Sequence, residues 1–277
     1  MPEIEVFVVD NDPEASGKRT AEAYRQSLPF PLHYQIEKKR GIPFVRNRLV
    51  ELAAGCDLIA FIDDDEEAEP HWLDELLYVH TTFNASVVTG PVLARFEITP
   101  PAWAVAGKFY ESARWPTGSS QRIFYTGNLL IESAVFSQFP KPFKESMALT
   151  GGTDSLFAMR VAETGVTAVW ADDAIVYEHI PATRATKRWY FMRRYRLGNT
   201  SVQCDRFLPK KHYQVRAILR AIFLVWLGVA VVVSSVWKGC YKVIRGIGYL
   251  CTAAGTMTGA LGLYQQEYGR DDYRKKR

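Results

Sequence analysis

Apolar runs of strand length alternate with stretches of helical spacing along most of the chain. Residues 58–62 are apolar at every position, which is typical of a strand buried on both faces of a parallel sheet. Residues 45–54, just before that run, place their apolar side chains on one helical face. Together with the β-branched run at 4–9, this order predicts a βαβ unit and an α/β fold. Further helices are predicted at 19–28 and 155–164, and further extended segments at 33–36, 85–92, 123–131, 166–170 and 174–177.

The pattern changes after residue 204, where two long uncharged stretches follow one another. Residues 221–237 and 246–266 contain no charged side chain, and each has about the length that crosses ~30 Å of hydrocarbon. Lys and Arg flank both stretches, so we expect a domain at 1–204 followed by a membrane-associated helical tail at 205–277. A spanning hairpin would place its short basic loop outside, against the positive-inside rule. A re-entrant or interfacial hairpin and two helices buried in a soluble domain therefore stay open as alternatives.

Charge and cysteine content narrow the class of protein. The chain has 277 residues and a formal net charge of +4, but residues 1–204 carry 21 Lys and Arg against 26 Asp and Glu, and residues 205–277 carry 13 against 4. A basic tail beside apolar stretches indicates the anionic face of a membrane rather than nucleic acid. The four cysteines form no CxxC pair, which excludes a disulfide framework and a zinc finger and favours a reducing, cytoplasmic setting.

Acidic residues follow two of the predicted strands. Asp10 ends the first, and Asp63, Asp64 and Asp65 end the apolar run at 58–62. Ligands gather at the carboxyl ends of strands in such folds, so we expect both groups to face one crevice. Three neighbouring carboxylates repel one another, and a divalent cation that bridges a bound phosphate would offset that cost. The alternative is a solvated acidic loop that caps the following helix.

Two further segments carry candidate chemistry. Asp154 follows Gly151-Gly152-Thr153 at a helix start, where it can act as a general base or as a plain N-cap. His179 follows a predicted strand and is a candidate metal ligand or phosphate contact, or a structural histidine.

A basic, aromatic-rich segment precedes the tail. Its arginines can bind a diphosphate or a lipid phosphate in bidentate fashion, or touch lipid headgroups from an amphipathic helix. They are Arg184, Arg188, Arg193, Arg194 and Arg196, and we assign Arg193 and Arg194 to the binding of such a diphosphate. Residues 100–120 hold aromatic side chains that can stack on a sugar ring or belong to the core, namely Trp103, Phe109, Tyr110 and Trp115.

Several short motifs together resemble the family 2 glycosyltransferases, over residues 4–200. Each motif is weak alone, but their order and spacing are specific. They are Val8-Val9-Asp10-Asn11, Gly41-Ile42-Pro43 with Arg46-Asn47, residues 61–65 with Trp72-Leu73, Thr126-Gly127-Asn128, and residues 151–154. The chain looks most similar to the bacterial members that extend exopolysaccharide repeats, such as the succinoglycan glucosyltransferases.

The resemblance implies a GT-A fold, a nucleotide-sugar donor such as a UDP-sugar, Mg²⁺ or Mn²⁺, and inversion at the anomeric carbon. Asp10 matches the aspartate that contacts the base, and Arg46 matches the arginine that helps to hold the nucleotide. Asp63 and Asp65 match the outer residues of the DXD motif, and we add Asp64 to the donor-binding set. Asp154 matches the catalytic base, with Thr153 in place of the usual Glu. We expect Asp65 and His179 to hold the metal.

The family also opens with a strand and a Pro-Thr-Tyr-Asn loop, and Met1 falls just before what resembles the second strand. We therefore expect either that the true start lies upstream of Met1 or that this GT-A domain lacks its usual first strand. The expected enzyme works on the cytoplasmic face of the inner membrane and acts on a lipid-linked saccharide. Two rivals stay open: a non-catalytic membrane subunit of a polysaccharide assembly complex, and a sugar nucleotidyltransferase. The second would need a Gly-rich phosphate loop that residues 11–17 do not supply.

Overall fold

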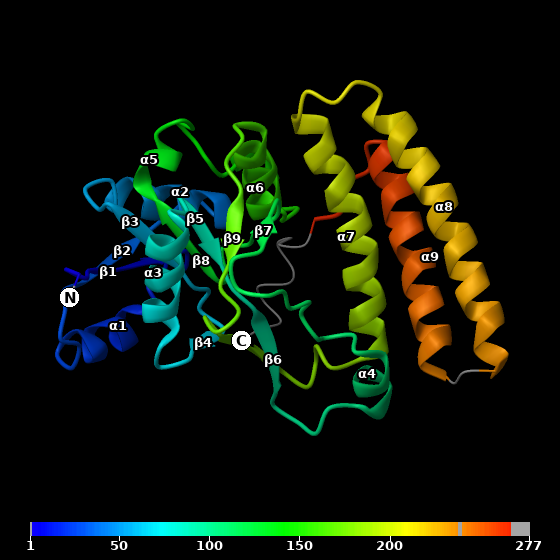
Figure 1. Cartoon of the computed structure of the whole chain (residues 1–277), viewed down its shortest axis with the longest axis horizontal. Helices are drawn as coiled ribbons and strands as arrows, with labels where there is room; N and C mark the ends of the chain where they lie inside the picture. Colours follow the sequence, from blue (N-terminus) through cyan, green and yellow to red (C-terminus); the bar gives the residue numbers. More distant parts are fainter. Residues whose placement is uncertain (1, 238–239, 267–277) are drawn as a thin grey trace.

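The computed structural model describes residues 2–237 and 240–266, which form an α/β part and, beside it, a unit of three long helices (Figure 1). The first helix of this unit lies next to the α/β part, and the second lies on the outside of the molecule (Figure 1). The basic residues that we expect to flank the apolar stretches at 238 and at 270–277 lie outside the described residues.

The largest sheet is mixed and has five strands in the order β3-β8-β5-β9-β7. Strand β8 runs antiparallel to both β3 and β5, whereas β5 runs parallel to β9. The predicted parallel pairing of residues 58–62 is therefore wrong. So is their burial on both faces, because β3 lies at the edge of this sheet and Ala60 is exposed. The strands are β3 (Leu58–Phe61), β8 (Leu129–Glu132), β5 (Val87–Thr89), β9 (Ala168–Trp170) and β7 (Ser120–Gln121).

Two smaller sheets complete the α/β part. Strand β1 (Val6–Asp10) pairs in parallel with β2 (Leu32–Ile36), and α1 (Lys18–Arg25) connects them. The expected absence of a strand before β1 stays a prediction. The second small sheet has the order β4-β10-β6, and β10 runs antiparallel to β4 and parallel to β6. Its strands are β4 (Glu66–Ala68), β10 (Val176–Ile180) and β6 (Val92–Phe96).

The helices predicted at 19–28, 45–54 and 155–164 are confirmed as α1, α2 and α6. The side chain of Phe157 on α6 is fully buried among four other phenylalanine rings, whose centroids lie 5.1–5.9 Å from its own. This aromatic core fixes the position of α6, whose first turn carries Asp154. The helical segments of the α/β part after α1 are α2 (Ile42–Leu52), α3 (Trp72–Phe83), α4 (Ala102–Gly107), α5 (Ser133–Phe136), the 3₁₀ turn η1 (Glu145–Met147) and α6 (Thr153–Glu163).

The helical unit begins earlier than the expected tail. Helix α7 (Lys187–Phe207) packs along α9 (Cys240–Ala260), and α9 packs along α8 (Tyr213–Val233), which the 3₁₀ turn η2 (Ser234–Trp237) follows. Residue 204, where we expect the domain boundary, lies within α7. The arginine-rich segment that precedes the tail in sequence therefore belongs, from residue 187 onward, to the same packed unit.

Glycines set the separation of α7 and α9. A Cβ atom at Gly255 would lie 1.9 Å from the carbonyl oxygen of Tyr195, and one at Gly198 would lie 2.1 Å from that of Thr252. Small residues that bring two helix backbones together are typical of helix pairs in membranes.

One described helix, Tyr213–Val233, is long and apolar enough to cross a membrane. Of the two spanning stretches that we expect, the second does not meet this criterion. Helix α9 carries Lys242 and Arg245 and packs against both of its neighbours.

Candidate active site

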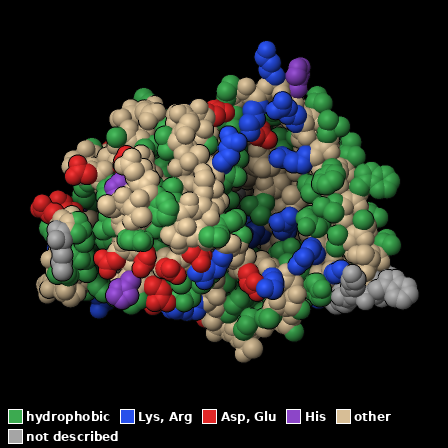
Figure 2. Space-filling model, in the orientation of Figure 1, with side chains coloured by type: hydrophobic (Ala, Val, Ile, Leu, Met, Phe, Trp, Pro, Cys, Tyr) green, Lys and Arg blue, Asp and Glu red, His purple; other side chains and the backbone are tan. Residues whose placement is uncertain are grey.

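A cleft of about 650 Å³ lies between the α/β part and the helical unit. Figure 2 shows a hollow between the two parts, with Lys and Arg side chains along its rim. A smaller cavity of about 180 Å³ shares Asp63 and Asp154 with the cleft and is also lined by Arg46, Gly151 and Gly152. Large concave sites with converging charged groups are where substrates bind in most enzymes.

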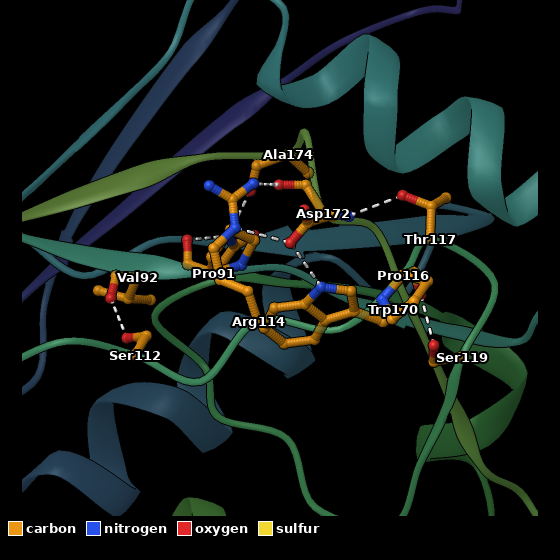
Figure 3. Close-up of polar contacts among 11 residues, drawn as sticks. Pro91, Val92, Ser112, Arg114, Pro116, Thr117, Ser119, Trp170, Asp172 and Ala174 are labelled. Atoms are coloured by element: carbon orange, nitrogen blue, oxygen red, sulfur yellow. Dashed lines mark hydrogen bonds and ion pairs between the residues drawn. The ribbon is translucent and has the colours of Figure 1, made fainter.

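A fixed loop forms one wall of the cleft. Residues 107–112 line it, and contacts of the next few residues hold them in place (Figure 3). The Nε atom of Arg114 donates to the Asp172 carboxylate at 2.8 Å, and the Asp172 backbone N–H donates to Thr117 at 3.1 Å. The Arg114 guanidinium holds the pKa of Asp172 below its usual value. The Ser112 hydroxyl donates to the backbone carbonyl of Val92, which fixes this wall against β6.

Two carboxylates of the acidic triplet face the cleft, and each has an arginine partner. The Asp63 carboxylate lies 3.1 Å from Arg46, and the Asp65 carboxylate lies 3.0 Å from Arg184. Burial raises the pKa of Asp63, Arg46 opposes this, and the charges of Asp154 and Asp65 raise it further. These carboxylates therefore share one electrostatic environment, as expected. Asp64 is exposed and is not among the residues that line the cleft.

Glu66 and Glu178 also line the cleft, opposite each other in the pairing of β4 and β10. Burial raises the pKa of Glu66 to about 8, and its carboxylate accepts a hydrogen bond from the Asp63 backbone N–H at 2.8 Å. Burial also raises the pKa of Glu178, and the charge of Arg193 opposes this. The structure does not bring His179 to the cleft, because successive side chains of a strand point to opposite faces; its ring lies 3.3 Å from the exposed Glu67 carboxylate.

Asp154 lies where the cleft and the smaller cavity meet, on the first turn of α6. It is not the N-cap, because Gly152 occupies the cap position in the left-handed conformation. A Cβ at Gly152 would lie 2.1 Å from the Thr200 methyl group, so only glycine allows α6 to start this close to α7. One carboxylate oxygen of Asp154 accepts a hydrogen bond from the Ser155 N–H at 2.8 Å, and the structure gives the other no hydrogen-bond partner among the described residues.

Asp10 lies outside both cavities, and its carboxylate organises the loop that follows β1. It accepts hydrogen bonds from the Tyr34 hydroxyl at 2.6 Å, from the Gly17 N–H at 2.9 Å and from the Asp12 N–H at 2.8 Å. The structure thus places Asp10 at the end of its strand, as expected, but does not bring it to the cleft.

The helical unit contributes arginines and aromatic rings to the cleft. Arg193 and Arg194 of α7 line it, as does Arg245 of α9. Phe109 and Tyr110 also line the cleft and pack against α7, where Phe109 lies 4.7 Å from the Tyr190 ring and Tyr110 lies 5.8 Å from the Trp189 ring. Of the other aromatic candidates, Trp103 packs on those two rings without lining the cleft, and Trp115 packs against Trp170 elsewhere.

Comparison with known proteins adds the family. Residues 1–138 match the model of "Glycosyl transferase family 2". The chain is 34% identical over 214 residues to the "Succinoglycan biosynthesis protein ExoM" of Rhizobium meliloti (strain 1021), which covers 77% of this chain and 68% of that protein. The chain belongs to glycosyltransferase family 2.

Another relative and two solved structures are similar to this family 2 chain. It is 25% identical over 240 residues to the "Glucosyl-dolichyl phosphate glucuronosyltransferase" of Haloferax volcanii, which covers 80% of this chain and 74% of that protein. Crystal structures of S. aureus TarS 1–349 with UDP and with UDP-GlcNAc give TM-scores of 0.53 and 0.54 at 12% and 14% identity. Each covers 98% of this chain and 90% of the TarS chain, and this likeness confirms the GT-A fold.

The acidic end of the cleft suits a hard divalent cation that also binds a phosphate. Among the described residues, no three His, Cys, Asp or Glu side chains are arranged to hold a metal ion. Mg²⁺ is commonly held by one or two carboxylates together with substrate phosphates, and the half-exposed carboxylates of Asp63 and Asp65 fit that donor set.

Several cleft residues of this family 2 chain were not predicted as site residues. The strand 176–180 carries Glu178 and His179 on opposite faces, and the sequence does not say which face is the inner one. Glu66 is hidden as the fourth acid of a run of five. Arg245 and Tyr249 lie in the stretch that the sequence predicts to be a membrane-associated tail, and only the packing of α9 against α7 brings them to the cleft.

Proposed function

We propose that this chain is an inverting glycosyltransferase that transfers a sugar from a nucleoside-diphosphate donor to a saccharide acceptor in bacterial exopolysaccharide or cell-surface glycan synthesis. One observation carries the proposal: a single cleft holds the carboxylates of Asp63, Asp65 and Asp154 together with two arginines of α7, Arg193 and Arg194. Transfer needs these groups together, to hold a diphosphate and to activate a hydroxyl. The relative ExoM is named for succinoglycan biosynthesis, which supports the proposed pathway class.

The donor is proposed to lie across the acidic end of the cleft. Asp63 and Asp65 would hold Mg²⁺ or Mn²⁺, and a bound cation supplies charge stabilisation for the departing diphosphate. Arg193 and Glu178 both line the cleft, and the charge of Arg193 opposes the raised pKa of Glu178. Arg46, beside Asp63, adds a further contact to the nucleotide. A UDP-sugar is our choice of donor, and the TarS structures with UDP and UDP-GlcNAc support it.

Asp154 is proposed as the general base. Its carboxylate takes the proton of an acceptor hydroxyl while the hydroxyl oxygen forms a bond to the anomeric carbon. The bond between that carbon and the donor phosphate oxygen breaks on the opposite side, so the configuration inverts and the nucleoside diphosphate leaves. The protein keeps the reacting groups in line by fixing α6 on its phenylalanine core and on Thr200.

We also propose that the helical unit lies at the cytoplasmic face of the inner membrane and that the acceptor is lipid-linked. The face of α8 away from α9 exposes Leu219, Phe223 and Trp226, whose exposed fractions are 62%, 63% and 72%. Arg216 is exposed at the start of the same helix, where it can contact anionic headgroups.

The test is sugar transfer by the full chain in bacterial membranes supplied with labelled UDP-sugars and Mn²⁺. Asp154→Asn should lower transfer to lipid-extractable product by about 10²–10⁴-fold, the usual contribution of a general base. Glu163→Gln, at the exposed end of the same helix, is the matched control and should transfer at the normal rate. Normal transfer by Asp154→Asn would remove Asp154 as the base. Wild-type membranes without transfer, and without metal-dependent UDP binding, would favour a non-catalytic subunit.

A further inference from the structure

The cleft has a second end, formed by Arg194 and Arg245 with aromatic rings between them. The Arg194 guanidinium carbon lies 5.8 Å from the centre of the Tyr249 ring, and that of Arg245 lies 5.7 Å from the Phe109 ring. Burial raises the pKa of Tyr190, whose ring lies 4.7 Å from that of Phe109, and the charges of both arginines oppose this rise. We call this region the arginine end of the cleft.

Among the described residues, neither arginine has an acidic partner. The ion pairs among the described residues include none with Arg194 or Arg245. The Nε atom of Arg194 is buried and finds no hydrogen-bond partner in the part of the chain that the structure describes, whereas Arg245 donates to the backbone carbonyl of Gly107 at 2.7 Å. Two like charges in a partly buried pocket repel each other, and a buried N–H without a partner adds to the cost. A bound anion would offset both.

The donor is not the anion that this end best fits. At the acidic end, a divalent cation together with Arg46 beside Asp63 and Arg184 beside Asp65 would supply positive charge to a diphosphate, so the donor does not need Arg194 or Arg245. The Arg193 guanidinium carbon lies 5.1 Å from the centre of the Trp189 ring, and its charge opposes the raised pKa of Glu178, whereas that of Arg194 lies 5.8 Å from the Tyr249 ring on α9. Neighbouring positions on a helix face directions about 100° apart, so the two arginines assigned together from the sequence serve different ends of the cleft.

We propose that Arg194 and Arg245 bind the phosphate of the carrier lipid to which the acceptor sugar is attached. This assignment rests on the proposed function and moves Arg194 from the donor to the acceptor. Guanidinium groups recognise phosphate oxygens in bidentate fashion without a metal. The arginine end belongs to the unit whose outer helix exposes an apolar face, which is where a lipid carrier would approach.

Binding of farnesyl diphosphate to the full chain in detergent micelles, without donor or metal, tests this assignment. The wild type should bind farnesyl diphosphate at least tenfold more tightly than farnesol, and more tightly than inorganic diphosphate. Arg194→Gln and Arg245→Gln should each weaken binding about tenfold, and Arg245→Lys should weaken it less. Arg19→Gln, an exposed arginine on α1 outside the cleft, is the matched control and should leave the dissociation constant unchanged.

A parallel titration with UDP and Mn²⁺ separates acceptor from donor. It should be unchanged in Arg194→Gln and Arg245→Gln. A loss of UDP binding in both variants would place the arginines in the donor site and overturn the assignment. Wild-type affinity of both variants for farnesyl diphosphate would also overturn the assignment. If the wild type bound inorganic diphosphate as tightly as farnesyl diphosphate, the arginine end would be a plain anion site, and the assignment would be overturned as well. Failure of the proposed function would be distinguishable, because the wild type would then neither bind UDP with Mn²⁺ nor transfer sugar.

Discussion

The α/β part is held together by large side chains, and the helical unit is held together by small ones. Phe157 fills the space between four rings in the first, whereas α7 and α9 meet at Gly198 and Gly255 in the second. A core of large rings is destabilised when a side chain is truncated, because truncation leaves a cavity. A glycine interface is destabilised when a side chain is enlarged, because the helix backbones are already in contact. Opposite substitutions should therefore damage the two parts.

The largest effect on stability is expected from Phe157→Ala. Removing a fully buried ring typically costs about 3–5 kcal/mol, because a cavity remains among the surrounding rings. Chemical denaturation in detergent measures the change. Tyr24→Ala, an exposed aromatic on α1, is the control and should change the free energy of unfolding by less than about 0.5 kcal/mol. A loss below about 1 kcal/mol for Phe157→Ala would show that the aromatic core is not what holds α6.

Gly255→Ala should show the opposite sensitivity in the helical unit. One added methyl group would lie 1.9 Å from the Tyr195 carbonyl, so α9 must move away from α7, at an expected cost of about 1–3 kcal/mol. Arg245 lies on α9 and would move with this helix, so the affinity for farnesyl diphosphate should fall as well. Gly55→Ala is the matched control, since a Cβ there meets nothing within 4 Å. An unchanged Gly255→Ala protein would mean that the two helices have room between them.

The parts also differ in how well the sequence predicts them. Residues 58–65 and 151–154 predict parts of the candidate active site from the sequence. An apolar run that ends in carboxylates indicates a strand end, and the double glycine before Asp154 indicates a tight backbone position. Sheet order was not predictable, since the antiparallel insertion of β8 between β3 and β5 depends on contacts across the chain. The helical unit was least predictable, because hydropathy reports whether a stretch is apolar and not which neighbour covers it.

Stability should also depend on pH through the acidic end of the α/β part. The pKa of Glu66 is raised by burial to about 8, so the folded protein holds this proton more tightly than the unfolded chain does. The contribution of Glu66 is full below its ordinary value near 4.5, falls as pH rises from there to about 8, and is lost above. Glu66→Gln stays neutral, so its melting temperature should fall by several degrees less than that of the wild type between pH 5 and 9.

Glu3→Gln, an exposed carboxylate near the start of the chain, is the control for this titration and should follow the wild-type curve. Parallel curves for Glu66→Gln and the wild type would show that the Glu66 carboxylate is ionised in the folded protein at neutral pH. The helical unit offers no comparable group in the described cleft, since it contributes arginines rather than carboxylates there.

The smallest effect on stability is expected from substitutions on the outer face of α8. These substitutions give the sharpest comparison between the helical unit and the α/β part. Phe223 and Trp226 are exposed, so the double change Phe223→Ser and Trp226→Ser should alter the free energy of unfolding in detergent by less than about 0.5 kcal/mol for each site. Burial of such side chains in a bilayer contributes about 1.5–3 kcal/mol each, so binding to anionic lipid vesicles should weaken at least about tenfold. Tyr24→Ser with Tyr78→Ser removes two equally exposed rings from the α/β part and should leave vesicle binding intact. If both double variants bound vesicles equally, the membrane contact would lie elsewhere, and the apolar face of α8 would need a protein partner instead.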